Sequence, residues 1–361
     1  MMLVGAALAG AKAWGADSSE PSKATTARSA TRGERPGSEY PLNQPLVVTP
    51  LNFVRAETDR QFAVFVDDRG AFGKLYHARE VAPIDRQPVV RMNRDTIYST
   101  GVFDLDAGPV TVTLPDPSTR FMSMQIINQD EYAPDALYGA GSHTLDRDTV
   151  GTRYAAIVIR TFVDPGNPAD MAAAHALQDA IKVEQPGGPG KFEIPQWDKT
   201  SQDKVRGALL TLASTMSNFT SAFGEQDAVD PVAHVIGAAA GWGGNPARDA
   251  VYESITPTEN DGRTTYRLHV EDVPVDGFWS ITVYNAEGYM QPNPQNAYSV
   301  NNVTAATNPD GSVDIQFGGC DESTPNCLPT APGWNYTVRL YRPHQEIIDS
   351  TWTFPNAEPL R

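Results

Sequence analysis

The most informative stretch of this chain is Arg91-Met92-Asn93-Arg94-Asp95-Thr96-Ile97-Tyr98-Ser99. It gathers four chemically capable side chains directly before a glycine and a strand-like run. Arg94 carries the planar fork that holds carboxylates at two points, Asp95 is suited to acid or base chemistry, and Tyr98 donates a hydrogen bond. We therefore predict catalytic roles for Arg94, Asp95 and Tyr98, with Asn93 as a ligand-binding residue. The alternative that stays open is a buried Arg94–Asp95 network that fixes a domain junction.

A second polar cluster, Asn128-Gln129-Asp130-Glu131-Tyr132, ends the predicted strand 121–128. Strand ends and the loops after them often carry functional side chains. We predict Asp130 as a further catalytic residue and Asn128 as a ligand-binding one. Calcium binding through these oxygens and an ordinary solvated strand end are the two alternatives.

A polar face is predicted along the late strands, where Thr282, Tyr284, Arg339 and Tyr341 stand at alternating positions. We assign ligand binding to Tyr284, Arg339 and the following Asn285 and Tyr289, as a surface for a sugar or an ester. The alternative is the outer face of a sandwich. A single functional cleft requires the ends of strands 121–128 and 279–285 to converge. The hypothesis is one inter-domain pocket lined by a subset of Asp95, Tyr98, Asn128, Asp130, Tyr284 and Tyr289.

The sequence lacks the common catalytic signatures. It has no Gly-x-Ser-x-Gly elbow, no His-Glu-x-x-His, no phosphate loop and no dinucleotide glycine fingerprint. Its 6 histidines are scattered without paired ligand spacing. We therefore expect no metal and no cofactor.

Composition restricts the partners. The chain has 361 residues, 40% of them hydrophobic, and a formal net charge of −16. This length suffices for two or three domains with cores of their own. A surface that binds nucleic acid needs clustered Lys and Arg, so nucleic acid is excluded as a partner. A small molecule or a carbohydrate remains as the expected ligand, and the sequence does not indicate an oligomeric state.

The N-terminus and the cysteines predict export to the periplasm or the medium. Residues 1–16 resemble a signal segment, with an apolar run too short to span a bilayer, and residues 17–48 resemble a disordered tether. The two cysteines, Cys320 and Cys327, are close in sequence, and a disulfide is natural in an oxidising compartment. Such a bond contributes about 2–3 kcal/mol of stability. A metal-binding pair would need two further ligands nearby, and none is visible.

Hydrophobic periodicity predicts β-rich ends and a helical middle. A capping residue followed by proline marks helix starts at Thr49-Pro50, Asn167-Pro168 and Asp230-Pro231. Another helix is predicted from about Asp203 to Gly224, with one apolar face. Alternating short strands favour antiparallel sandwiches over a parallel sheet. Strands are predicted at 121–128, 154–159, 266–270, 279–283, 313–317 and 336–340, with a turn at Asn308-Pro309-Asp310-Gly311 between the strands around it.

Two parts of the chain resemble known protein families. The region from about 50 to 170 resembles the bacterial domain of unknown function 1254, and the motif at residues 91–99 carries this resemblance. Residues from about 250 to 361 resemble its usual partner, domain of unknown function 1214, through Asp276–Asn285, Tyr298–Asn302 and Gly333–Pro343. The resemblance implies a mainly β fold with a helical insert, and no established reaction. The implied divisions are an immunoglobulin-like sandwich with a leading helix at 49–166, a small helical domain at 167–246, and a C-terminal jelly-roll sandwich at 247–361. Cys327 stands where the family usually has a tryptophan.

Two classes of function follow. The first is an exported hydrolase that acts on a hydroxylated or ester substrate at the inter-domain cleft. The second is a non-catalytic protein that binds carbohydrate or another component of the cell envelope with the same surface.

Overall fold

The computed structural model describes residues 40–87, 90–216 and 218–360, and residues 37–361 form one compact unit. The predicted signal segment and most of the predicted tether lie outside the described residues. Residues 40–48 belong to the compact unit instead. Val48 is buried, and β1 (Pro45–Leu46) pairs in parallel with β10 (Gln196–Trp197). The prediction of a tether up to residue 48 was therefore too long at its C-terminal end.

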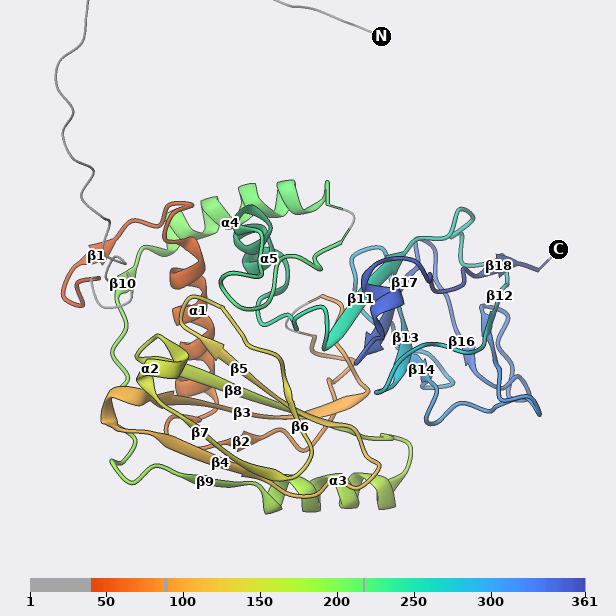
Figure 1. Ribbon diagram of the computed structural model, residues 1–361. Helices are drawn as coiled ribbons and strands as arrows, with labels where there is room; N and C mark the ends of the chain where they lie inside the picture. The colour runs from red at the N-terminus through yellow and green to blue at the C-terminus, as the bar shows by residue number, and fades with distance from the viewer. Residues whose placement is uncertain (1–39, 88–89, 217, 361) are drawn as a thin grey trace, which may run out of the picture. The chain divides into compact units, whose positions relative to one another are not determined.

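The first half of the compact unit is built on a five-stranded antiparallel sheet (Figure 1). Its long central strand, β8 (Tyr154–Phe162), is buried along its whole length. This is because alternate residues of β8 face two different cores. Ala155, Ile157 and Ile159 pack toward the three-stranded sheet, and Ala156 and Val158 pack toward the helices. In order, the strands are β2 (Tyr76–His77), β3 (Thr96–Asp104), β8 (Tyr154–Phe162), β5 (Met122–Asn128) and β6 (Leu137–Tyr138).

A three-stranded antiparallel sheet covers one face of this sheet, with a core of aliphatic residues between the two. Its order is β7 (Gly141–Leu145), β4 (Val110–Leu114) and β9 (Lys182–Glu184). Short helix α2 (Arg147–Val150) follows β7, and α3 (Pro168–Ala180) contributes Ala174 to a small core with Ile97 of β3.

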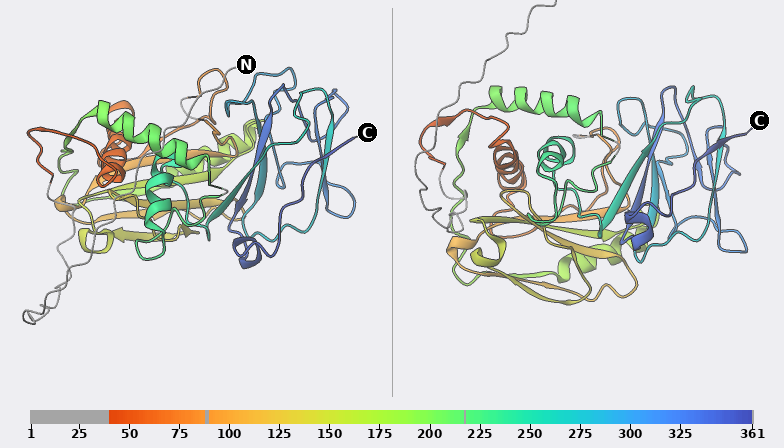
Figure 2. Two further views of the ribbon diagram at one scale, coloured as in Figure 1. Left: turned by 90° about the horizontal axis from the view of Figure 1, so that it is seen from above. Right: turned by 45° about the horizontal axis from the view of Figure 1, so that its top comes forward.

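Three helices cover the other face (Figure 2). They are α1 (Phe53–Ala63), which continues as a π-helical turn at Val64–Asp68, α4 (Lys199–Ala213) and α5 (Pro231–Gly241). Asn167 and Asp230 cap α3 and α5 as predicted, each with its side chain accepting two backbone amides. Two predictions were wrong. Helix α1 has Asn52, not Thr49, at its N-cap, and α4 starts after Asp198 and ends near Ala213 rather than at Gly224.

The second half contains two four-stranded sheets that enclose one core. The predicted turn at 308–311 is present, but β14 before it and β15 after it lie in different sheets, so it does not close a hairpin. The first sheet has the order β11 (Ala250–Ile255), β17 (Asn335–Tyr341), β13 (Trp279–Tyr284) and β14 (Ser299–Asn301). The second has the order β16 (Cys327–Leu328), β15 (Val313–Phe317), β12 (Tyr266–Val270) and β18 (Glu358–Pro359); helix α6 (Gln345–Ile348) precedes β18.

The predicted disulfide is confirmed: Cys320 and Cys327 are bonded, with their Cα atoms 5.6 Å apart. A mainly β fold with several antiparallel sheets and a few helices is also confirmed. Within the described residues, no helix is both long and apolar enough to cross a membrane.

Candidate functional site

The segment before β3 leaves the five-stranded sheet and lies against one face of the sheet formed by β11, β17, β13 and β14. Three backbone contacts hold it there. The amide of Arg91 donates to the carbonyl of Gly288 at 2.8 Å, the hydroxyl of Tyr284 donates to the carbonyl of Met92 at 2.9 Å, and Arg339 donates to the carbonyl of Arg91 at 2.9 Å. The face that the sequence offered as a ligand surface is therefore covered here by the chain itself.

Asp95 lies at the centre of this contact and is only 1% exposed. Its Oδ1 accepts from Asn301 Nδ2 at 3.3 Å, and its amide donates to Asn93 Oδ1 at 2.6 Å. Burial raises the pKa of Asp95, and the charge of Arg339 with polar contacts from Ser280, Asn301 and Ser299 opposes that rise. The side chains that hold this carboxyl group all come from the second half of the chain, whereas Asp95 itself belongs to the first.

Arg339 is the main cation of the junction. It is 4% exposed, and it donates to Thr282 Oγ1 at 2.9 Å and to the Tyr284 hydroxyl at 2.7 Å. Burial alone would lower the pKa of Arg339, but Tyr284, Tyr341 and Asp95 together raise it above its ordinary value. Burying a guanidinium is costly unless it is paired and hydrogen-bonded, and this one is surrounded by acceptors.

The other predicted residues of 93–98 also have partners. Asn93 donates from Nδ2 to the Tyr341 hydroxyl at 2.6 Å. Arg94 donates to the carbonyl of Ala82, and its guanidinium lies 5.2 Å from the centre of the Tyr298 ring. No Arg94–Asp95 ion pair occurs among the described residues, so the predicted network forms with a different cation, Arg339. We call Asn93, Asp95, Tyr284, Arg339 and Tyr341 the junction network.

Two arginines of this region escaped the sequence analysis. Arg91 donates to Asn335 Oδ1 at 2.7 Å and to Thr337 Oγ1 at 3.2 Å. Arg160, on β8, donates to Gln125 Oε1 at 2.8 Å, and its guanidinium lies 5.7 Å from the centre of the Tyr98 ring. A signal for Arg160 existed: it directly follows the continuous apolar run 154–159, where a charge needs buried partners.

Asp130 and Asn128 do not join the junction network. Thr96 pairs with Phe162 of β8, whereas Asn128 pairs with Ala155. Residues 155 and 162 stand seven steps apart on one strand, which corresponds to roughly 20 Å. The predicted convergence was wrong because the start of β5, not its end, lies at the junction. There Phe121, just before β5, packs on Phe278 and Tyr341, and the C-terminal end of β5 lies at the opposite end of the sheet.

At that opposite end of the sheet, the side chains of residues 128–132 bond to other parts of the protein. Asp130 pairs with Arg55 of α1 at 2.5 Å, and Asn128 Oδ1 accepts the amides of Asp130 and Tyr132. Glu131 is buried, and one of its oxygens accepts the amide of Gly243 at 2.9 Å. Burial raises the pKa of Glu131 to about 8. The three side chains have separate protein partners, and the described residues contain no group of three or more His, Cys, Asp or Glu side chains that could hold a metal ion.

Asn285 and Tyr289 form a turn at the end of β13. Asn285 Oδ1 accepts the amides of Glu287 at 3.1 Å and Tyr289 at 2.8 Å. Of these two, Asn285 lines a small hollow of about 100 Å³ that also includes Tyr284 and Tyr298. This hollow contains no residue from 93–130, so it does not unite the two predicted clusters.

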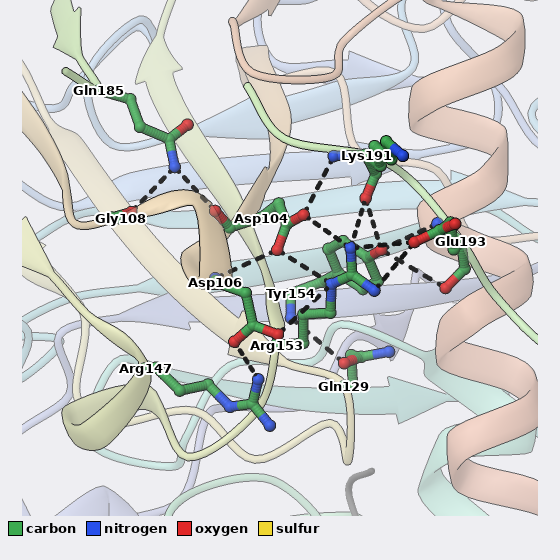
Figure 3. A network of polar contacts seen from close by, with 10 residues as sticks. All are labelled: Asp104, Asp106, Gly108, Gln129, Arg147, Arg153, Tyr154, Gln185, Lys191 and Glu193. Carbon is green, nitrogen blue, oxygen red and sulfur yellow. Dashed lines mark hydrogen bonds and ion pairs between the residues drawn. The ribbon is translucent and has the colours of Figure 1, made fainter. Parts of the chain in front are cut away.

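A further closed network surrounds the first residues of β8 (Figure 3). Arg153 donates to both carboxyl oxygens of Asp104, at 3.1 and 2.9 Å, and pairs with Glu193 at 3.3 Å. Partial burial alone would raise the pKa of Asp104, but the hydrogen bonds from Arg153 and Lys191 lower it. Its charges are matched within the protein, as in the junction network.

An open hollow lies elsewhere, in the second half of the chain. It has a volume of about 470 Å³, within the range of small-molecule sites, and we call it the groove. One wall comes from residues 295–305 and the other from residues 321–328, including the disulfide-bonded Cys327. Nothing in the sequence pattern had marked these residues for binding.

Comparison with known proteins agrees with the resemblance noted from the sequence. Residues 72–144 match the family described as protein of unknown function DUF1254, and residues 254–345 match the one described as protein of unknown function DUF1214. Both predicted domains are thereby confirmed, in the predicted order. No curated protein sequence matches this chain.

Among solved structures, the VPA0106 protein from Vibrio parahaemolyticus is similar in fold, with a TM-score of 0.69 at 16% sequence identity. The match covers 86% of this chain and 98% of that protein. An uncharacterized protein from Burkholderia cenocepacia matches with a TM-score of 0.47 and 13% identity, over 85% of this chain and 87% of that one. The first of these supports the fold alone.

Proposed function

We propose that this protein is an exported, non-catalytic binding protein that engages a polar component of the cell envelope through the groove. The observation that carries the proposal is the contrast in access between the two candidate sites. The junction network is mostly buried and most of its polar atoms have partners within the protein, whereas the groove is open and bordered by polar side chains.

The hydrolase alternative has weaker support in this geometry. A general acid or base must come within hydrogen-bond reach of its substrate. Asp95 is only 1% exposed, and side chains of the second half of the chain surround its carboxyl group. Asp130, the second predicted catalytic carboxylate, lies at the opposite edge of the sheet and is paired with Arg55. We therefore assign the predicted residues of the junction network to holding the two halves together.

Export and the finer architecture belong to the same proposal. The disulfide fits an oxidising compartment, which supports export. We propose that the five-stranded sheet together with β4 and β7 constitutes an immunoglobulin-like sandwich within 49–166, followed by a helical domain at 167–246 whose strand β9 completes the three-stranded sheet. The eight strands of the two later sheets fit a jelly-roll sandwich at 247–361.

The test compares turnover with binding. The purified protein is assayed against a panel of nitrophenyl esters and glycosides and, separately, for saturable binding to isolated bacterial cell envelopes. We expect envelope binding that Thr304→Trp, which fills the groove, abolishes, and that Val303→Trp, an adjacent exposed position outside the lining, leaves intact. Ester or glycoside turnover that is lost in a folded Asp95→Asn variant would instead establish the hydrolase.

A further inference from the structure

We propose that the groove binds an extended peptide segment that carries basic side chains, held by backbone hydrogen bonds from two facing sheet edges. This inference rests on the proposed binding function and names the ligand class of the same site. It derives from strand pairing, from the borders of the groove and from its charge.

The first edge is β14, the last strand of its sheet. The amide of Val283 donates to the carbonyl of Tyr298 at 3.0 Å, and the amide of Asn302 donates to the carbonyl of Trp279 at 3.3 Å. In an antiparallel pair, hydrogen-bonded positions alternate, so residues 298, 300 and 302 face β13 with their backbone groups. The N–H and C=O of Ser299 therefore point away from β13, and Ser299 lines the groove.

The second edge is β16, which pairs in parallel with β15. The amide of Gln316 donates to the carbonyl of Asn326 at 3.2 Å, and the amide of Gly318 donates to the carbonyl of Leu328 at 2.9 Å. Residues 326 and 328 thus direct their backbone groups to β15, and the N–H and C=O of Cys327 point to the other side. Cys327 also lines the groove, so each wall presents one backbone donor and one acceptor.

The length of the free edge is limited on β14. The side chain of Asn293 pairs with both backbone groups of Ala297, at 3.0 and 2.9 Å, in the manner of a neighbouring strand. On the other side, the carbonyl of Asn301 accepts the amide of Ala305 at 3.0 Å. Between these two contacts, Ser299 is the residue of β14 that points both its N–H and its C=O away from β13, where no strand of the described residues pairs with them. This favours a short extended segment over a full additional strand, in a variant of peptide recognition at a sheet edge.

Charge decides which peptide fits. Asp321 and Glu322 are exposed at the border of the groove, and no Lys or Arg is among its lining residues. Hydrogen bonds from Thr324 and Ser323 lower the pKa of Asp321, which keeps its carboxylate ionised at neutral pH. Complementary charge favours and steers a basic partner. A sugar ring finds no aromatic side chain to stack on among the lining residues, which is why a peptide is preferred here to a carbohydrate.

The experiment uses three blocked hexapeptides with the disulfide-intact protein and measures dissociation constants by fluorescence anisotropy. The first alternates lysine and valine, the second replaces each lysine with glutamate, and the third is the lysine peptide with alternate backbone amides N-methylated. We expect saturable binding of the first and at least about tenfold weaker binding of the other two. No binding of the lysine peptide, or equal binding of the N-methylated peptide, would overturn the inference.

Matched variants locate the site. Thr304→Trp should weaken binding of the lysine peptide by at least about tenfold, and Val303→Trp should not change it. Glu322→Gln should weaken it about two- to fivefold, whereas Glu346→Gln, the same charge change away from the groove, should have no effect. Unchanged binding in Thr304→Trp would place the peptide elsewhere and refute the inference. If envelope binding depends on the groove but no peptide binds, the proposed function stands and the peptide inference fails.

Discussion

β14 contacts the junction network with its side chains and lines the groove, and polar groups have opposite roles at these two places. On the junction side, the side chains of Ser299 and Asn301 help to hold the carboxyl group of Asp95. On the groove side, no strand of the described residues pairs with the backbone groups of Ser299. The charged motif at residues 91–99 therefore stabilises the packing of the two halves. The accessible hydrogen-bond donors and acceptors are main-chain groups at the edge of a sheet. A cluster of charged and polar side chains in the sequence can therefore mark a structural contact rather than a ligand-binding site.

The largest expected effect comes from breaking the junction network. Arg339→Met leaves Asp95 buried without its nearby cation and removes the donor to Thr282 and Tyr284. Removing one partner of a buried charged network costs about 3–5 kcal/mol. Urea denaturation should show this loss, and Arg263→Met, at an exposed position, should change stability by less than about 0.5 kcal/mol. Similar midpoints for both variants would contradict a structural role for the junction.

The interior and the groove should also respond differently to pH. The folded pKa of Glu131 is raised to about 8 from an ordinary value of 4.5. Its contribution to stability is therefore fully present below about pH 4.5 and is lost as pH rises through about 8, because only the unfolded state ionises freely in between. The loss is on the order of 5 kcal/mol. Glu131→Gln should flatten the fall in stability between pH 5 and 9, in denaturation curves recorded at several pH values.

Glu322→Gln is the matched control for that experiment, since it removes an exposed carboxylate of the groove. Its pH profile should follow that of the unmodified protein. Identical profiles for the Glu131 and Glu322 variants would show that the interior carboxylate is not what titrates.

Removing the disulfide should have an intermediate effect on stability and should also weaken binding in the groove. Cys320 and Cys327 close a loop with a sequence separation of 7. A small loop of this kind contributes about 2–3 kcal/mol through the restricted unfolded chain. The double variant Cys320→Ser with Cys327→Ser should lose that much in urea denaturation and should also bind the lysine peptide more weakly. Two reactive thiols in the unreduced native protein would contradict the bond itself.

The smallest expected effect on stability belongs to the groove-filling variant. Thr304 is exposed, and its side chain makes one hydrogen bond, to Asn301. Thr304→Trp should therefore shift the free energy of unfolding by less than about 1 kcal/mol while it removes binding. A loss comparable to that of Arg339→Met would mean that the groove, too, is part of the packed structure.

Much of the fold could be read from the sequence, because it depends on local signals. The alternation in 266–270 and 279–283, the caps at Asn167 and Asp230 and the cysteine spacing each gave the correct element or bond. The end of α4 could not be read, because Leu212, Met216 and Phe219 keep the helical period although the helix ends near Ala213. There, tertiary packing overrides local periodicity.

The candidate site was predicted only in part, for a physical reason. The motif 91–99 indicated buried charge, but which cation faces Asp95 depends on β17, more than two hundred residues away. The direction of β5 decided that Asn128 and Asp130 lie far from Asp95, and strand direction within a sheet is not encoded locally. The groove left no signal at all, because its donors and acceptors are backbone groups that every residue except proline possesses.

The most direct test of this account is amide hydrogen exchange of the intact protein with and without the lysine–valine hexapeptide. The account predicts that the peptide slows exchange at the amides of Ser299 and Cys327 and leaves the amides of Asp95 to Ser99 unchanged. Protection at Asp95 to Ser99, with Ser299 and Cys327 unaffected, would contradict it and return the binding site to the junction.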